Sequence, residues 1–217
     1  MIKRNPKEYS PIKDFLLFPL RAIFLVEESK FGLTSLRDER FRYVKKYVVG
    51  RCLDIGCGKN NIFIKQFLNN HGIGLDIFPY EGLTEDNLVE TFCELPYPDN
   101  SFGTVTFIAN FNHIPRDLRS QEIREAYRIV ERGGRIIVTM GSPIAELLAH
   151  LNVWLQDKFF GTNIDMDSER GMAEGESFFV LDEEIKGCLE NSGFSNLERH
   201  YFPTQWWLNH LWIGFKG

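Results

Sequence analysis

The sequence predicts a layered α/β fold around a mostly parallel β-sheet, and three observations support this prediction. Strand-like and helix-like segments alternate from Val48 onward, as they do when helices connect parallel strands. Two strand-like runs near the C-terminus are separated by only a few residues, which favours a hairpin and an antiparallel sheet edge. The 217 residues, 43% of them hydrophobic, are enough for one globular domain with a full core.

The central elements follow one another in chain order. Residues 51–55 form an apolar run that predicts the first strand, and residues 60–68 predict its helix. Apolar residues recur at helical spacing over residues 116–131, and a Gly-Gly pair at 133–134 is expected to stop that helix. The further expected strands are 72–76, a weaker one at 88–92, 105–109 and 135–140.

The C-terminal part predicts one more helix and the hairpin. Asp182 is the expected N-cap of this helix, and Gly193 follows its end. Residues 197–202 and 206–215 are the expected hairpin strands. The stretch 143–180 is longer than an ordinary connection, so we expect it to form an insert or lid on the substrate side. The chain thus divides into an N-terminal helical segment, residues 1–47, and a main domain, residues 48–217.

Charge and cysteine usage narrow the function classes. The formal net charge of −5 argues against a nucleic-acid-binding protein, which needs a basic face. Residues 1–50 nevertheless hold 11 Lys or Arg against 6 Asp or Glu, so this segment is basic. The four cysteines form no CxxC pair, which favours reduced thiols and a cytoplasmic location. The apolar run 15–26 is too short to span a bilayer, so it is expected to be buried against the body or to lie on a membrane surface.

A glycine turn after the first strand predicts a cofactor site. Ligands of open α/β sheets bind outside the carboxyl ends of the strands, where Gly56 and Gly58 let the backbone approach a ligand. Asp76, which ends the second expected strand, is placed to bind ribose hydroxyls. A dinucleotide fingerprint would have a third glycine where Asn61 stands, and Asp54 would repel a pyrophosphate. The same residues suit a zwitterionic amino acid joined to an adenosine.

Five blocks of the sequence together resemble the class I S-adenosylmethionine-dependent methyltransferases. They are "VVGRCLDIGCGKNN", "GIGLDIFP", "ELPYPDNSFGTV", "IANFNHIP" and "AYRIVERGGRIIVTM", and they extend over about residues 48–140. The third block places the chain near the methyltransferase type 11-like subgroup, and "LENSGFSNLERHYF" resembles the closing helix and strand of that family. The resemblance implies a Rossmann-like αβα sandwich with a seven-stranded, mostly parallel sheet and an antiparallel C-terminal hairpin. It also implies S-adenosyl-L-methionine as the cofactor.

The resemblance assigns cofactor-binding roles to nine residues. The glycine turn would hold the methionine portion near one acid, a second acid would bind the ribose, and two short loops would contact the adenine and the reacting sulfonium. Two positions depart from the pattern of the family, because Thr91 and Gly103 stand where acids are usual. The departure at Thr91 concerns the contacts expected at the edge of the adenine ring. The nine residues are Asp54, Gly56, Gly58, Asp76, Ile77, Glu94, Leu95, Asn110 and Phe111.

The acceptor side is less defined by the sequence. Methyl transfer from a sulfonium depends mainly on alignment and exclusion of water, and a base is needed only if the acceptor must lose a proton. His113 is the candidate base, with helix capping as the alternative. Arg170, Glu174 and Glu176 in the insert are candidate substrate contacts, whereas a calcium loop starting at Asp165 lacks its required glycine, so no metal is expected.

The favoured hypothesis is therefore a cytoplasmic methyltransferase, a monomer or homodimer, acting on a small or medium-sized molecule. It would bind no nucleic acid and would not insert stably into a membrane. One alternative is a non-catalytic S-adenosylmethionine-binding regulator or partner subunit with the same fold. Another is a nicotinamide-dependent oxidoreductase, which Asn61 and Asp54 disfavour.

Overall fold

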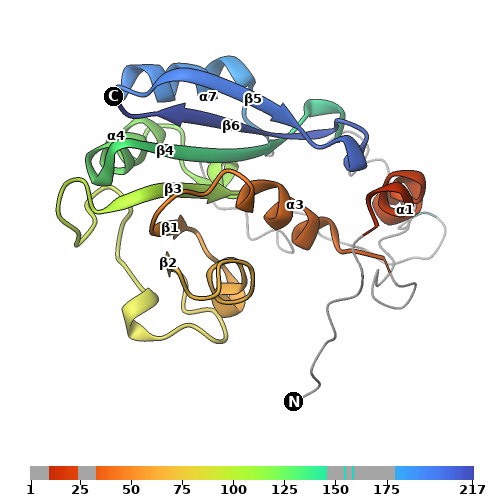
Figure 1. The fold of residues 1–217 in the computed structure, drawn as a ribbon, viewed down its shortest axis with the longest axis horizontal. Coiled ribbons are helices and arrows are strands. Elements are labelled where there is room, and N and C mark those ends of the chain that lie inside the picture. The colour runs from red at the N-terminus through yellow and green to blue at the C-terminus, as the bar shows by residue number, and fades with distance from the viewer. Residues whose placement is uncertain (1–9, 24–32, 146–153, 155–157, 159–178) are drawn as a thin grey trace.

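The computed structural model describes residues 10–23, 33–145, 154, 158 and 179–217, and these form an α/β structure around one mixed sheet (Figure 1). Six strands lie in the order β2-β1-β3-β4-β6-β5. The first four in chain order run parallel, whereas β6 is antiparallel to both of its neighbours. Their bounds are β1 Cys52–Ile55, β2 Gly72–Leu75, β3 Phe102–Ile108, β4 Val130–Gly141, β5 Ser195–Tyr201 and β6 Asn209–Phe215.

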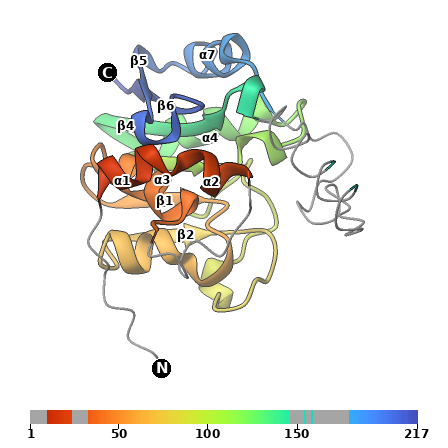
Figure 2. The ribbon, with the colours of Figure 1, turned by 90° about the vertical axis from the view of Figure 1, so that its right-hand side faces the viewer.

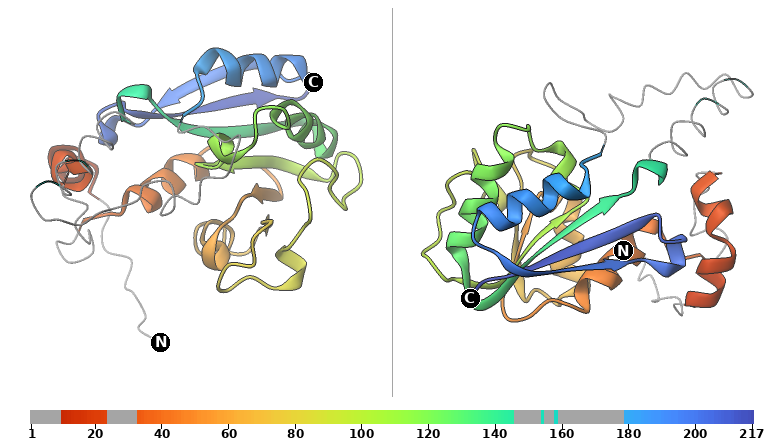
Figure 3. Two further views of the ribbon diagram at one scale, coloured as in Figure 1. Left: turned by 180° about the vertical axis from the view of Figure 1, so that it is seen from behind. Right: turned by 90° about the horizontal axis from the view of Figure 1, so that it is seen from above.

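Helices cover both faces of the sheet (Figure 3). Alternate residues of a strand point to opposite faces, so Ile136 and Val138 of β4 pack into one core cluster and Ile137 into another. The first cluster includes the apolar residues of α4 (Arg119–Ile129) and α7 (Asp182–Asn191). The second includes those of α3 (Leu36–Lys45) and of η3 (Phe63–Phe67). The predicted three-layer class is confirmed.

The predicted third strand at residues 88–92 is wrong, so the described part of the chain has six strands rather than seven. Among the described residues, only one bridge, between Asp76 and Leu88, extends the sheet beyond β2. A short 3-10 helix, η4 (Glu85–Asn87), occupies this edge instead, and Asn87 Nδ2 donates to the Gly74 carbonyl at 2.8 Å. Val89 and Phe92 of this segment still pack on the core, so it buries its apolar side chains without joining the strand ladder.

The helix predicted at residues 60–68 is irregular. It consists of the 3-10 helix η2 (Lys59–Asn61) and the π-helix η3. Asn60 and Asn61 have φ values of 64° and 47°, and this left-handed conformation is incompatible with a regular helix. Asn61 also packs against the edge strand, because a Cβ on Gly74 would lie 2.3 Å from Asn61 Oδ1.

The expected cap at Asp182 is also wrong, although α7 begins there. Leu181 is the N-cap residue and makes no side-chain cap bond. Asp182 instead accepts hydrogen bonds from Trp212 Nε1 at 3.0 Å and His210 Nε2 at 2.7 Å, and it pairs with Arg199. Burial alone would raise the pKa of Asp182, but these hydrogen bonds and charges bring it below its ordinary value. The carboxylate thus ties the start of α7 to β5 and β6.

Before α3, the N-terminal segment contains two short helices, α1 (Pro11–Leu16) and α2 (Phe18–Ile23), that lie beside the turn between β5 and β6 (Figures 2 and 3). Arg21 donates to Glu39 Oε2 of α3 at 2.8 Å, and both side chains are fully buried. Gln205 Nε2, from the 3-10 helix η6 (Pro203–Gln205), donates to the same oxygen at 2.9 Å. One buried carboxylate therefore joins three segments that are distant in the sequence.

A buried carboxyl in α4 makes stability depend on pH. Glu122 is 5% exposed, its Oε2 has no hydrogen-bond partner within the described residues, and burial raises its pKa to about 7. The folded state holds the Glu122 carboxyl proton more tightly than the unfolded chain does. The contribution of Glu122 to the free energy of unfolding therefore falls as pH rises from about 4.5 to 7. Glu122→Gln should therefore be more stable than the wild type at pH 8 by about 1–3 kcal/mol, with a smaller difference at pH 5.

Urea unfolding at both pH values measures this effect. The exposed Glu131 follows the same helix, and Glu131→Gln provides the matched control. A Glu122→Gln variant whose stability relative to the wild type is equal at the two pH values would contradict the prediction.

Candidate functional site

The glycine turn lies at the carboxyl end of β1. Gly56 and Gly58 have φ values of 70° and 63°, which glycine adopts without strain. A Cβ on Gly56 would lie 1.7 Å from Asn110 Nδ2, so only glycine lets the Asn110 side chain cross the turn. A Cβ on Gly58 would have no atom within 4 Å, so the backbone there borders open space. The turn thus presents an accessible stretch of main chain at the edge where ligands of such sheets bind.

Asp76 lies directly beside this turn. Its side chain is 5% exposed and follows β2, the neighbour of β1. The Gly58 N–H donates to Asp76 Oδ2 at 2.9 Å, and the Phe78 N–H donates to Asp76 Oδ1 at 3.0 Å. Each carboxylate oxygen still has acceptor capacity, because an ionised carboxylate offers about four lone-pair sites. The acid and the turn, eighteen residues apart, form one local structure.

Asp54 lies within β1 and is 2% exposed. Its Oδ1 accepts a hydrogen bond from Thr106 Oγ1 of β3 at 2.7 Å. Burial raises the pKa of Asp54 to about 7; the Thr106 hydrogen bond opposes this shift and the charge of Asp76 adds to it. A nearby ammonium group would favour the charged form, so this acid is suited to a cationic ligand.

The end of β3 carries a strained backbone and an unpaired amide oxygen. Ala109 has a φ of 54°, which is uncommon for a residue with a Cβ, and its N–H donates to Thr139 Oγ1 at 2.8 Å. Asn110 Nδ2 donates to the Ile55 carbonyl at 2.7 Å, whereas Asn110 Oδ1 is buried without a partner in the described residues. Sequence reasoning selected Asn110 but missed Ala109, because no residue type signals this conformation.

The residues predicted to contact the adenine and the reacting centre differ in exposure. Ile77 is 45% exposed and Glu94 is exposed, so both are accessible to a ligand. Leu95 and Phe111 are buried in the core at 4% and 0% exposure. Their direct contact with a cofactor stays a prediction, as do the roles of the other seven residues.

Two residues that sequence reasoning missed hold the loop around Leu95. Glu125 of α4 accepts a hydrogen bond from the Leu95 N–H at 2.6 Å. Arg128, one helical turn later, pairs with Glu125 and donates to the Leu95 and Tyr97 carbonyls at 3.2 and 2.8 Å. The only sequence signal was the spacing of an acid and a base at i and i+3.

The acceptor side is described only in part. His113 ends the 3-10 helix η5 (Phe111–His113), directly after β3, and its N–H donates to the Asn110 carbonyl at 2.8 Å. It is half-buried and lies on the same sheet edge as the glycine turn. Arg170, Glu174 and Glu176, together with Asp165 and most of the predicted lid, lie outside the described residues. No cluster of three or more His, Cys, Asp or Glu residues suited to a metal ion occurs in the described ranges.

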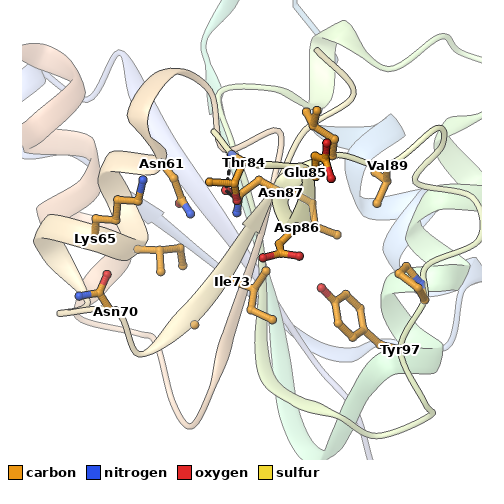
Figure 4. Close-up of a pocket in the computed structure, with 15 residues that line it drawn as sticks. Asn61, Lys65, Asn70, Ile73, Thr84, Glu85, Asp86, Asn87, Val89 and Tyr97 are labelled. Atoms are coloured by element: carbon orange, nitrogen blue, oxygen red, sulfur yellow. Dashed lines mark hydrogen bonds between the residues drawn. The ribbon is translucent and has the colours of Figure 1, made fainter. Parts of the chain in front are cut away.

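A pocket of about 560 Å³ lies along the outer edge of β2, separate from the glycine turn (Figure 4). It is bordered by Asn61 and Lys65 on one side and by Asn87 and Tyr97 on the other. None of the nine predicted cofactor residues lines it. Because η4 takes the place of the third strand, we interpret this pocket as space left at the open sheet edge.

Comparison with known proteins supplies independent findings. Residues 53–138 match a family model described as a methyltransferase domain. The chain is 30% identical over 139 residues to the ubiquinone/menaquinone biosynthesis C-methyltransferase UbiE of Cellvibrio japonicus, covering 59% of this chain and 54% of that relative. It is 25% identical over 191 residues to the protein of the same name from Burkholderia mallei, covering 77% of this chain and 75% of that relative.

The fold is also found among solved structures. A SAM-dependent methyltransferase from Archaeoglobus fulgidus superposes with a TM-score of 0.59 at 17% identity, covering 89% of this chain and 99% of that chain. At this identity the similarity concerns the fold alone. The chain spans only about half the length of the Cellvibrio relative, so the acceptor in that relative's name does not transfer directly.

Proposed function

We propose that this chain, whose residues 53–138 match a methyltransferase domain, is a class I S-adenosylmethionine-dependent methyltransferase that methylates a small or medium-sized acceptor. It would act in the cytoplasm as a monomer or homodimer. The observation that carries the proposal is the pairing of the glycine turn with Asp76, whose carboxylate accepts the Gly58 N–H. In this geometry a carboxylate can accept hydrogen bonds from ribose hydroxyls beside an exposed main-chain turn. The names of the relatives agree with methyl transfer.

Three properties of the glycine turn and its neighbouring residues fit the cofactor. The open space at Gly58 admits an approaching ligand. The buried, unpaired Asn110 Oδ1 offers an acceptor to a ligand N–H. The raised pKa of Asp54, which burial causes, makes its ionisation responsive to an ammonium group. We propose that Asp76 holds the ribose and Ile77 packs on the adenine, with Glu94 and Leu95 at its edge.

S-adenosylmethionine supplies an electrophilic methyl group on a sulfonium. The contribution of the chain is to fix the direction of attack and to exclude water. We propose that Asn110 and Phe111 border the reacting end, that residues 1–47 cap it and that residues 143–180 act as its lid, with Arg170, Glu174 and Glu176 contacting the acceptor. His113 would accept a proton where the acceptor carries one to lose.

Thermal unfolding with added ligands tests this function. S-adenosylmethionine or its demethylated product, at about 100 times the dissociation constant, should stabilise the fold by roughly 2.7 kcal/mol. NAD at the same concentration should leave the melting temperature unchanged. Stabilisation by NAD and not by S-adenosylmethionine would reassign the site to a dinucleotide.

A further inference from the structure

An exposed apolar surface lies where the N-terminal helices meet the hairpin turn. Ile12, Leu16 and Leu20 are 75%, 65% and 47% exposed, whereas Phe18 between them is buried at 4%. In the adjacent hairpin turn, Trp206 and Trp207 are 44% and 53% exposed. We call this surface the α1–tryptophan patch; it consists of Ile12, Phe15, Leu16, Leu20, Trp206 and Trp207.

Phe15 connects the two parts of the patch, which are far apart in the sequence. The Phe15 ring lies 6.2 Å from that of Trp206 and 6.1 Å from that of Trp207, measured between ring centroids. Trp206 Nε1 donates to the Phe15 carbonyl at 2.9 Å. The buried Arg21–Glu39 pair fixes α2 to α3. These contacts hold the helices and the hairpin turn that carry the exposed apolar side chains.

The turn that displays the tryptophans is strained. Trp206 and Trp207 have φ values of 50° and 58°, a left-handed conformation that costs an L-residue about 1–2 kcal/mol. Bulky residues rarely occupy this region, and such strain is concentrated at binding and functional sites. Since much of both indoles is exposed rather than buried, core packing alone does not account for this geometry.

The patch lies on the same edge of the sheet as the glycine turn. β4 runs parallel to β1 through β3, and its last residue, Gly141, pairs with Asn209 at the start of β6. The turn before β6 therefore lies at the carboxyl ends of the parallel strands. Figure 3 shows α1 and α2 beside this end of the hairpin. A surface that bound the patch would face the edge that carries the cofactor turn.

We infer that the α1–tryptophan patch docks on an anionic lipid bilayer surface. Tryptophan and aliphatic side chains on short helices suit the boundary between headgroups and acyl chains. Four of the six patch residues also belong to the basic part of the chain, residues 1–50, which hold 11 Lys or Arg against 6 Asp or Glu. This charge complements an anionic lipid surface.

Docking of this kind is peripheral. Within the described ranges, the helices are too short or too polar to cross a membrane. The bilayer would hold the cofactor edge close to the headgroups. If the chain is the methyltransferase proposed above, its acceptor would then be a molecule carried in or on the lipid layer. This step alone rests on the proposed function.

Co-sedimentation of the full chain with vesicles tests the inference. We expect binding to vesicles of phosphatidylcholine with phosphatidylglycerol, weaker binding to phosphatidylcholine alone, and loss of the difference at high salt. The double variant Leu16→Ser/Trp207→Ser should bind the anionic vesicles at least about tenfold more weakly, because it removes two apolar contacts. Val49, 38% exposed near the opposite edge of the sheet, provides the control Val49→Ser.

Each outcome decides the inference. Absence of wild-type binding to anionic vesicles at low salt overturns it, as does equal binding by the double variant. A concentration-dependent dimer that the double variant abolishes, without vesicle binding, would instead assign the patch to a second copy of the chain. Melting curves with S-adenosylmethionine keep the proposals separate, since the cofactor shift in the single variant Trp207→Ser, which lies outside the segment proposed to cap the site, should equal that of the wild type.

Discussion

Glu39→Ala should lower the free energy of unfolding by about 3 kcal/mol, because it leaves the buried Arg21 guanidinium with only the more distant Asp14 carboxylate, 3.7 Å away. Both side chains of the Arg21–Glu39 pair are inaccessible to solvent, and the N···O distance is 2.8 Å. The same carboxylate accepts from Gln205 Nε2, so the variant also removes the link to the hairpin turn. Urea denaturation followed by circular dichroism measures the loss.

The double variant Arg21→Met/Glu39→Leu tests whether the stability loss in Glu39→Ala comes from a buried charge that has lost its partner or from lost packing. Replacing both partners by apolar residues removes the buried guanidinium but also takes it away from the buried Asp14 carboxylate, so it should recover part of the stability that Glu39→Ala loses. Asp38 of the same helix pairs with Arg37 on the surface, and Asp38→Ala should change stability by less than about 1 kcal/mol. A double variant as unstable as Glu39→Ala would contradict this account.

The sequence predicted the parallel strands and the turn at Gly56 because their signals are local. A buried parallel strand appears as an apolar run, and a left-handed turn at a strand end selects glycine. Both signals depend on residues within a few positions of each other. The structure accordingly confirms the strands around Leu53, Val105 and Ile137 to within a few residues.

The differences arise where distant residues determine the structure. The segment around Leu88 had the length of a strand, but Asn87 holds it as a turn against the Gly74 carbonyl. Asp182 had the residue type of a cap, but the polar groups of β5 and β6 engage its carboxylate. Neither partner can be identified from spacing along the chain. The same holds in the site, where Asn110 crosses Gly56 over a separation that no local pattern encodes.

Asp76→Ala should weaken the binding of S-adenosylmethionine by at least about 100-fold, because two charge-assisted hydrogen bonds to the ribose would each contribute about 1.5–3 kcal/mol. The variant also removes the acceptor of the Gly58 N–H, which loosens the turn. Isothermal titration calorimetry measures the affinity directly. Asp76→Asn should fall between the two proteins, because it keeps one acceptor oxygen and loses the charge.

The matched control separates the glycine turn from the pocket beside β2. Asp86 is an exposed acid that lines this pocket, ten residues after Asp76. Asp86→Ala should bind S-adenosylmethionine with the affinity of the wild type if the cofactor lies in the turn. The opposite result, with affinity lost in Asp86→Ala and kept in Asp76→Ala, would move the cofactor to the outer edge of the sheet. Because the two acids lie on the same segment, a general disturbance of that segment would affect both variants.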